Sequence, residues 1–371
     1  MDHRPEHRAV DRPGGHGGRA RRHGHPVHRE HQSQEAGRHL VRHLRRPRRR
    51  LRSPAPGTVT MAVIDRRTGL EIPESGFGGG ALDFLYGNVF GRILLKYVAA
   101  APWFSRWRGG RRDRPESKDD ILPFLEENRI DLSDGGFGPG WQADGFATFN
   151  EFFTRQRDYG AYYAALREHG LLADPASERA ELPAVADARL SVWPVGPDLA
   201  VPVKQSVYTL KELVGQRAHD IDLTPFEGGH CLVFRLGVDD YHRYVFPDSG
   251  RLVRRYFIPG ELHTVRPVSE RYRVYARNAR SVSILDTDHF GPLLTVEVGA
   301  MLVGHIVEHP LPNITFDALQ EKGYFEFGGS TVLLVTGPNV TIDTDLLEAS
   351  ARGDEVKVRL GEPVGRKGKA S

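Results

Sequence analysis

The sequence has few cysteines, and its first 60 residues lack most apolar residue types. Of the 371 residues only Cys231 is a cysteine, so a disulfide within the chain is excluded. In a chain with no secretion signal, a single thiol favours the cytosol as the compartment. Cys231 precedes Leu232 and Val233, and we interpret it as a buried strand residue without a chemical role.

Residues 1–60 contain no Ile, Phe, Tyr, Trp or Lys, which excludes a hydrophobic core in this segment. They hold 15 Arg, 5 acidic residues and nine of the 17 histidines, so the formal charge is +10 here and −7 in the rest of the chain. We expect a disordered extension, and because Met61 begins an ordinary sequence, an over-extended start codon explains it best. A nucleic-acid arm and a metal-binding tract are the alternatives. No aromatic residue interleaves the arginines and the histidines lack ligand spacing, so we expect neither nucleic acid nor metal.

A helical pattern begins after the Gly-rich residues 76–80. Five apolar residues recur there at helical spacing, namely Leu82, Leu85, Val89, Ile93 and Tyr97. Charged residues interrupt the run, so it is not a membrane span. Trp103 and Trp107 stand beside several arginines, which is typical of a helix in the headgroup layer of an anionic membrane. Packing of residues 81–108 on the protein's own core is the alternative. We interpret residues 61–180 as a helical, membrane-associating region.

Two further helices are expected at residues 119–133 and 148–170, with a Gly-rich loop at residues 135–140 between them. Thr148 stands at the N-cap position of the second helix, and Glu151 follows three residues later in the capping-box pattern. The phenylalanines at the start of this helix are interpreted as packing residues.

From about residue 182 onwards the sequence consists of short β-rich runs separated by Gly and Pro, with a soft boundary near Pro175 and Pro183. Strands are expected at residues 190–193, 231–236, 251–258, 271–276, 281–285 and 293–298. The fold class is therefore α+β, with a helical N-terminal region followed by a mainly antiparallel β domain over residues 181–371.

Residues 321–335 contain a Gly-Gly-Ser turn between two strand-like runs. The two glycines let the backbone bend sharply, which brings the Ser330 hydroxyl close to the carbonyl of Gly329. A serine in this position can attack that carbonyl. A plain hairpin turn is the alternative, because Gly-Gly-Ser is a common turn composition.

Five blocks resemble the phosphatidylserine decarboxylase family, and they occur in the family's order: residues 149–155, 186–189, 240–243, 298–304 and 321–335. The resemblance in which these blocks occur extends over most of the chain from about Met61 onwards. In this family a Gly-Ser-Thr serine breaks the chain before itself and becomes a pyruvoyl cofactor. The resemblance implies self-cleavage between Gly329 and Ser330, with Ser330 becoming the pyruvoyl group.

The resemblance also implies a base and an orienting carboxylate, because an unassisted serine is a weak nucleophile. His242 is the candidate base and the later proton donor, with Asp187 as its partner. The chain departs from the commoner motif, which has a second histidine where Val245 stands and a Gly where Ala188 follows Asp187. Other residues are thus to be considered: His263 and His305 as substitutes for the base, and Arg243, Arg266 and His263 as substrate-binding residues, the arginines for a phosphate.

Residues 353–365 resemble the turn-and-strand pattern of biotinyl and lipoyl barrels, to which the decarboxylase fold is related. No lysine stands at a hairpin tip in the carrier pattern, so a swinging-arm role is rejected. The resemblance therefore implies a barrel-related catalytic domain over residues 181–371.

The function implied by the resemblance is decarboxylation of phosphatidylserine to phosphatidylethanolamine, through a Schiff base to the pyruvoyl group. The implied partners are phosphatidylserine in an anionic membrane and the two cleaved chains, at the cytoplasmic face of the cell membrane as a peripheral protein; a homodimer stays open. A pyruvoyl decarboxylase of a soluble amino-acid-like substrate and a non-catalytic lipid-binding barrel are the alternatives. Only a maturing enzyme yields two fragments, so intact mass separates it from the binding protein.

Overall fold

The computed structural model of the protein describes residues 62–72, 111–128, 130, 145–203, 206–263, 273–300, 305–328 and 330–368. Several predictions concern residues outside these ranges. They are the basic extension at 1–60, the helix at 81–108, the loop at 135–140, and the roles of Arg266 and Gly329. Within these ranges, no helix combines the length and the apolar character that crossing a membrane requires.

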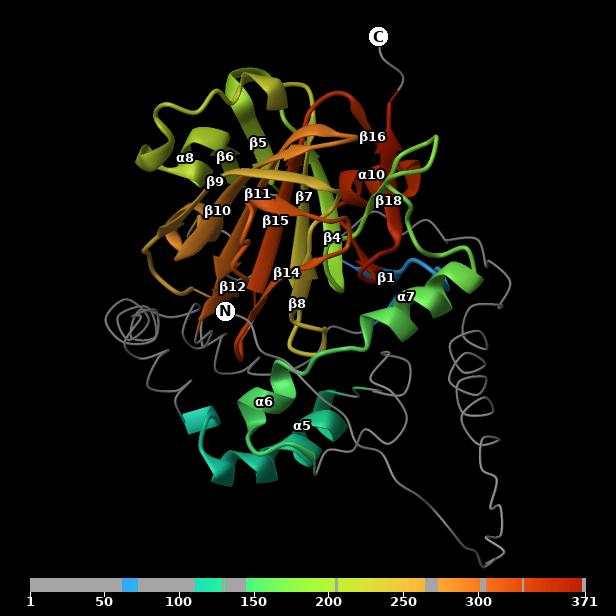
Figure 1. Cartoon of the computed structure of the whole chain (residues 1–371), viewed down its shortest axis with the longest axis vertical. Helices are drawn as coiled ribbons and strands as arrows, with labels where there is room; N and C mark the ends of the chain where they lie inside the picture. Colours follow the sequence, from blue (N-terminus) through green and yellow to red (C-terminus); the bar gives the residue numbers. More distant parts are fainter. Residues whose placement is uncertain are drawn as a thin grey trace, which may run out of the picture.

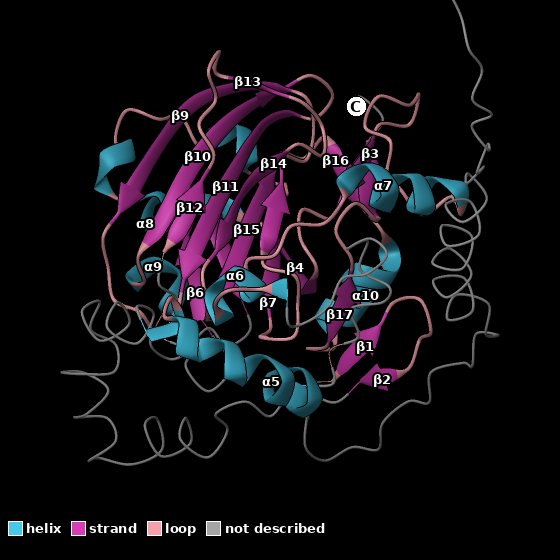
Figure 2. Cartoon of the chain, turned by 60° about the horizontal axis from the view of Figure 1, so that its bottom comes forward, coloured by secondary structure: helices cyan, strands magenta, loops and turns pink. Residues whose placement is uncertain are grey.

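A ten-stranded, curved sheet forms the centre of the molecule (Figure 2). Its strands in spatial order are β13 (Thr315–Phe316), β9 (Gly250–Ile258), β10 (Arg280–Thr287), β11 (Gly291–Gly299), β15 (Ser330–Thr336), β7 (His230–Leu236), β4 (Ala188–Pro194), β17 (Glu355–Val358), β1 (Val63–Asp65) and β2 (Glu71–Ile72). Among the described strands only β1 and β17 pair in parallel. β15 and β7 lie in the middle, and nearly every residue in them is buried, because both faces of the sheet are covered there.

Three smaller sheets surround the large one. They are β12 (Ile306–Glu308), β14 (Glu321–Phe325) and β8 (Arg243–Val245); β16 (Val340–Ile342), β18 (Pro363–Lys367) and β3 (Glu181–Pro183); and β5 (Ala200–Val203) with β6 (Ser206–Thr209). The first of these lies against one face of the large sheet (Figure 1). Buried charges join the two layers, since Lys322 of β14 pairs with Glu297 of β11 at 2.9 Å and with Glu308 of β12 at 3.0 Å. Burial raises the pKa of Glu297 to about 7, in spite of the nearby ammonium.

Short helices lie around the sheets. They are α5 (Ile121–Asn128), α6 (Phe149–Phe153), α7 (Tyr159–Glu168), α8 (Leu210–Val214), α9 (Val274–Arg277) and α10 (Thr344–Ala351), with 3-10 turns η2 (Pro115–Asp120), η4 (Pro197–Leu199), η5 (Gln216–Ala218) and η6 (Thr224–Phe226). α5 and α6 lie below the lower end of the large sheet in Figure 1, where β8 and β14 also end. α10 is tied to β4, since the Val192 amide donates to the Ser350 hydroxyl at 2.8 Å.

Most of the strand predictions are confirmed, and so is the α+β, mostly antiparallel class. Residues 190–193, 231–236, 251–258, 281–285 and 293–298 lie in strands, and Cys231 is buried in β7 as expected. The described strands form open sheets rather than the closed barrel that the C-terminal pattern suggested.

Two of the predicted elements are wrong, and one predicted cap is only partly present. The helix expected at 148–170 is two helices, because the chain leaves α6 at Thr154, whose hydroxyl donates back to the Asn150 carbonyl at 2.8 Å, and starts again at the Asp158 N-cap. The strand expected at 271–276 is helix α9 in its described part, where Arg273 has a left-handed backbone with a φ of 54° and Tyr275 packs on Tyr208 in the core. The Thr148 cap is present, but Glu151 reaches the Ala147 amide instead of completing a capping box.

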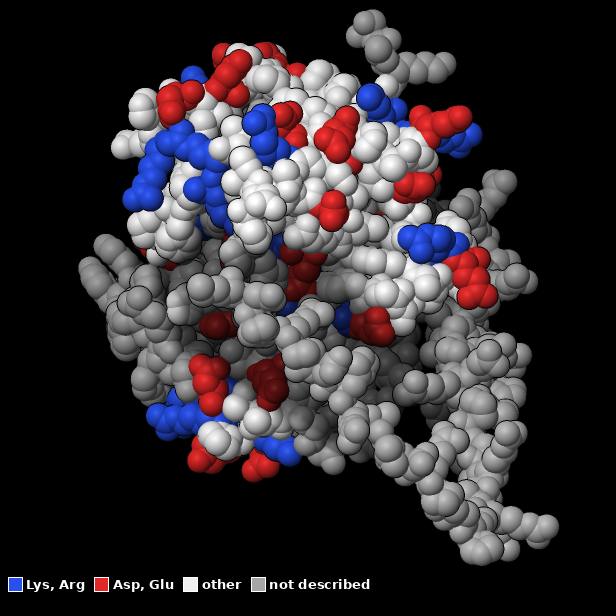
Figure 3. All heavy atoms as spheres, viewed as in Figure 1, with Lys and Arg blue, Asp and Glu red and all other residues white. Residues whose placement is uncertain are grey.

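Positive and negative side chains are interspersed on the face of the molecule seen in Figure 3. On β9, Arg251 pairs with Asp286 at 3.3 Å and Arg254 pairs with Asp220 at 2.7 Å. The exposed arginines of this strand therefore have acidic neighbours, and such exposed pairs contribute little to stability.

Candidate active site

Ser330 begins the central strand of the large sheet. It pairs with Gly299 of β11 on one side and with Leu236 of β7 on the other, and its side chain is fully buried. Two residues earlier, Gly328 has a φ of 144°, a conformation that favours glycine. Of the two glycines of the expected turn, only Gly328 is described, and it has a conformation that a side chain would disfavour.

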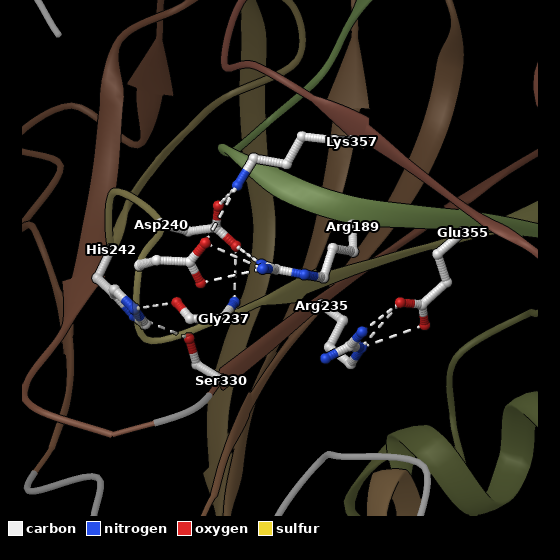
Figure 4. Close-up of polar contacts among 9 residues, drawn as sticks. Arg189, Arg235, Gly237, Asp240, His242, Ser330, Glu355 and Lys357 are labelled. Atoms are coloured by element: carbon white, nitrogen blue, oxygen red, sulfur yellow. Dashed lines mark hydrogen bonds and ion pairs between the residues drawn. The ribbon is translucent and has the colours of Figure 1, made fainter. Parts of the chain in front are cut away.

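The imidazole of His242 faces the Ser330 hydroxyl. Ser330 Oγ lies 3.3 Å from His242 Nδ1, and His242 Nε2 lies 2.8 Å from the carbonyl oxygen of Gly237 (Figure 4). A carbonyl oxygen only accepts hydrogen bonds, so the proton of the neutral ring is on Nε2. The lone pair of Nδ1 therefore points toward the serine hydroxyl, which is the arrangement of a base and its nucleophile.

Burial keeps this imidazole neutral. The side chain of His242 is 1% exposed, and desolvation lowers its pKa to about 3. The ring of Phe153 lies against it, with 4.2 Å between the ring centres. Phe153 belongs to an aromatic cluster that consists of Phe124, Phe149, Phe152, Phe153 and Phe327. The interpretation of the phenylalanines of α6 as packing residues is confirmed, and their cluster also covers the histidine.

Asp187 is not a neighbour of the imidazole in this structure. Its carboxylate forms an ion pair with Arg157, with 3.2 Å between Oδ1 and Nη1, and accepts from the Leu360 amide at 2.8 Å. Burial raises the pKa of Asp187, but the charge and hydrogen bonds of Arg157 outweigh it and hold the value at about 2. The expected orienting role toward His242 therefore needs correction, because both ring nitrogens have other partners.

Val245 stands where the commoner motif has a second histidine. Val245 is buried in an apolar cluster with Tyr162 and Leu360, on the side of β8 where Asp187 lies, since Tyr162 donates to the Leu360 carbonyl and Leu360 to Asp187. Arg157, which the sequence analysis did not single out, holds Asp187 here. Its only sequence signal is that it lies two residues after the block at residues 149–155.

The other candidate residues lie in separate surroundings. His263 Nε2 contacts Glu261 at 2.8 Å, and His305 is 68% exposed, with Glu326 at 3.5 Å. The guanidinium of Arg243 pairs with Glu321 at 2.5 Å and donates to the Thr154 carbonyl at the end of α6. These contacts give Arg243 a structural role, and they lend no support to phosphate binding. None of the three is brought to Ser330 by a contact of the described residues.

The fold and the site together define an α+β protein with a buried serine and histidine pair, the constellation of an enzyme that uses nucleophilic catalysis. The pair is enclosed on one side by the large sheet and on another by the phenylalanines of α6.

Comparison with known proteins identifies the family. The family model for phosphatidylserine decarboxylase matches residues 149–366. Phosphatidylserine decarboxylase proenzyme 2 of Clostridium acetobutylicum is 38% identical over 294 residues, which is 79% of this chain and 94% of the relative. The phosphatidylserine decarboxylase proenzyme of Fusobacterium nucleatum is 33% identical over 307 residues, 81% of this chain and 96% of the relative. The chain belongs to the phosphatidylserine decarboxylase family.

Proposed function

We propose that the chain is the proenzyme of a phosphatidylserine decarboxylase and that Ser330 is converted into its pyruvoyl group by autocatalytic cleavage after Gly329. The observation that supports this most directly is the 3.3 Å contact between Ser330 Oγ and the unprotonated Nδ1 of His242. The proposed substrate, phosphatidylserine, comes from the names of the relatives, which are proenzymes of phosphatidylserine decarboxylases.

Self-cleavage begins when His242 Nδ1 takes the proton of the Ser330 hydroxyl and Oγ attacks the Gly329 carbonyl. The peptide C–N bond breaks, the proton passes to the nitrogen, and Gly329 becomes an ester of Ser330. Loss of the Ser330 Cα proton then expels the Gly329 carboxylate, and water replaces the nitrogen as ammonia. Ser330 is left as a pyruvoyl group at the start of the new chain.

The residues present fit this group, because Ser330 is its precursor and already lies beside a base. When formed, the pyruvoyl carbonyl binds the substrate amine and accepts the electrons that carbon dioxide leaves behind. His242 is the proposed proton carrier in both stages. Its pKa of about 3 means that the ring is unprotonated before it acts and that it holds any proton it takes only transiently; the proposed role rests on its position beside Ser330.

We assign Asp187 a positioning role that differs from the one in the sequence analysis. Through Arg157 and the Leu360 amide it joins the segment between α6 and α7 to the turn before β18. It therefore supports the fold around the site, while Gly237 orients the ring.

We further propose that the substrate is reached from an anionic membrane at the cytoplasmic face, through residues 81–108 of a region that extends over 61–180, with catalysis in residues 181–371. This rests on the tryptophans and arginines of that segment. Removing residues 81–108 should abolish binding to phosphatidylserine vesicles, and added salt should weaken the arginine contribution in the intact protein.

Intact mass under denaturing conditions tests the central proposal. The parent should give a large N-terminal and a small C-terminal chain, and the small chain should resist Edman sequencing because pyruvoyl blocks it. Ser330→Ala should remain one chain and release no carbon dioxide from phosphatidylserine vesicles. Thr331→Val is the matched control, since the Thr331 hydroxyl is buried and makes no hydrogen bond in the described structure; it should still split. An uncleaved parent with full activity would refute the serine mechanism, and activity on soluble serine without lipid would favour the soluble-substrate alternative.

A further inference from the structure

The orientation of His242 depends on one backbone carbonyl, that of Gly237, so the position of Gly237 decides where the base points. Gly237 is held from both sides by Asp240. The Gly237 amide donates to Asp240 Oδ2 at 2.7 Å, and the Asp240 amide donates to the Gly237 carbonyl at 3.0 Å. The same carbonyl accepts from His242 Nε2 at 2.8 Å. Asp240 thus holds in place the Gly237 carbonyl, and this carbonyl orients the imidazole of His242.

Asp240 is in turn held by two cations from neighbouring strands. Its side chain is fully buried; Oδ2 accepts from Arg189 of β4 at 2.6 Å, and Oδ1 accepts from Lys357 of β17 (Figure 4). Arg189 also binds Asp239 through two contacts of 3.0 Å. A buried carboxylate with a fully charged set of partners has one well-defined position, because any displacement exposes charges to a medium that does not solvate them.

Two side chains pack closely against the backbone of Gly237. A Cβ atom at Gly237 would lie 2.3 Å from Arg189 Nη1 and 2.6 Å from Asp239 Oδ1. The guanidinium therefore lies directly against the backbone of the residue whose carbonyl orients the histidine, and a side chain at this position would have to displace Arg189 or Asp239.

We propose that Asp240 is the positioning residue for self-cleavage, and that Lys357 couples this positioning to the docking of the C-terminal segment. This inference rests on the proposed function. Lys357 lies beyond Ser330 in the sequence, in the part that becomes the small chain. We call the contacts of Asp240 with Gly237, Arg189 and Lys357 the clamp. The clamp is complete only when β17 has docked between β4 and β1, which places Lys357 beside Asp240. The base is therefore aligned last, and the chain cuts itself after it has folded.

The tautomer of His242 gives a direct readout of the clamp. In Ser330→Ala protein with 15N-labelled histidine, the ring should carry its proton on Nε2 only, as the Gly237 carbonyl requires. In Ser330→Ala/Asp240→Asn and Ser330→Ala/Lys357→Met, the two ring nitrogens should show a mixture of tautomers. Glu355→Gln in the same background is the matched control. It neutralises the carboxylate of another buried ion pair, with Arg235, and should leave the tautomer unchanged. A single Nε2 tautomer in both clamp variants would overturn the inference.

The rate of self-cleavage is the second readout, measured on the full chain as the split fraction at successive times after a pulse of synthesis. Asp240→Asn should slow splitting by about a hundredfold, the effect expected when a reacting group is misplaced by roughly 1 Å. Lys357→Met should slow it about tenfold, as a partial misplacement, and Lys357→Arg should restore most of the rate. Glu355→Gln should split at the parental rate even if its melting temperature falls.

The outcomes separate the two proposals. If Asp240→Asn does not fold, the comparison of Lys357→Met with Lys357→Arg decides in its place. Splitting of both clamp variants at the parental rate contradicts the inference but leaves the proposed function intact. A parent that never splits contradicts the proposed function itself.

Discussion

Acid should destabilise the protein through His242, and the size of the effect follows from its burial. The imidazole is neutral in the folded chain, where desolvation lowers its pKa to about 3, whereas in the unfolded chain it titrates near about 6.5. Below the higher value the unfolded state binds a proton that the folded state does not. The contribution of His242 is therefore fully present above about pH 6.5 and is lost as the pH falls toward 3.

Between pH 7 and pH 5 this linkage removes about 2 kcal/mol from the free energy of unfolding, at about 1.4 kcal/mol per pH unit below the unfolded pKa. The perturbation is His242→Gln, which keeps a polar side chain but has no titration in this range. Both proteins should carry Ser330→Ala, so that an intact chain is compared with an intact chain. The variant starts less stable at pH 7, and it should lose about 2 kcal/mol less than its parent on acidification.

The assay is urea unfolding at pH 7 and pH 5, with the difference taken within each protein so that all other titrating groups cancel. His305→Gln is the control: its side chain is 68% exposed, so it removes a histidine that the fold does not bury, and this protein should still lose more stability on acidification than the His242→Gln variant. Equal losses in the His242→Gln protein and its parent would refute the reasoning that burial keeps this ring neutral.

Three further outcomes are expected. Asp187→Asn should destabilise the Ser330→Ala protein by about 3–5 kcal/mol, because it leaves the buried Arg157 without its counter-charge; an unchanged urea midpoint would contradict the ion pair. Phe153→Leu and Phe124→Leu should each cost about 1 kcal/mol, but only the first, which contacts the His242 ring, should slow splitting on a denaturing gel. Deleting residues 1–60 should leave splitting and carbon dioxide release unchanged, since that segment has no Ile, Phe, Tyr or Trp and too few apolar residues for a core; insoluble protein would show this reading to be wrong.

Strand positions were accessible to sequence analysis because their signal is local. The β-rich runs at residues 231–236 and 281–285 are short and continuous because these strands are buried on both faces of the sheet. The break after α6 has no such signal. Residues 154–158 contain neither proline nor glycine, and Arg157 leaves the helical path to reach Asp187, thirty residues away in sequence. Contacts at this separation override helix propensity.

The site was accessible through resemblance rather than through spacing, since 88 residues separate His242 from Ser330. The partner of the imidazole was not accessible at all. A sequence motif identifies side chains, so a carboxylate was expected to orient the imidazole. In the structure the backbone carbonyl of Gly237 accepts the hydrogen bond of the ring instead. The glycine at position 237 indicates this role only indirectly, because a side chain there would meet Arg189.

The position of β15 in the sheet has a consequence for the mature enzyme. β15 lies between β11 and β7, and β17 lies between β4 and β1, so the segment after Ser330 is interleaved with the segment before it. If the bond before Ser330 is cut as proposed, this interleaving and the ion pairs of Glu355 and Lys357 hold two separate chains together. Full denaturation would release the small chain, and reassembly would require two molecules to meet and thread a strand into the middle of a sheet. Recovery of the mature form after heat inactivation should therefore be poor and should depend on protein concentration, whereas the uncut Ser330→Ala chain should recover as a single molecule.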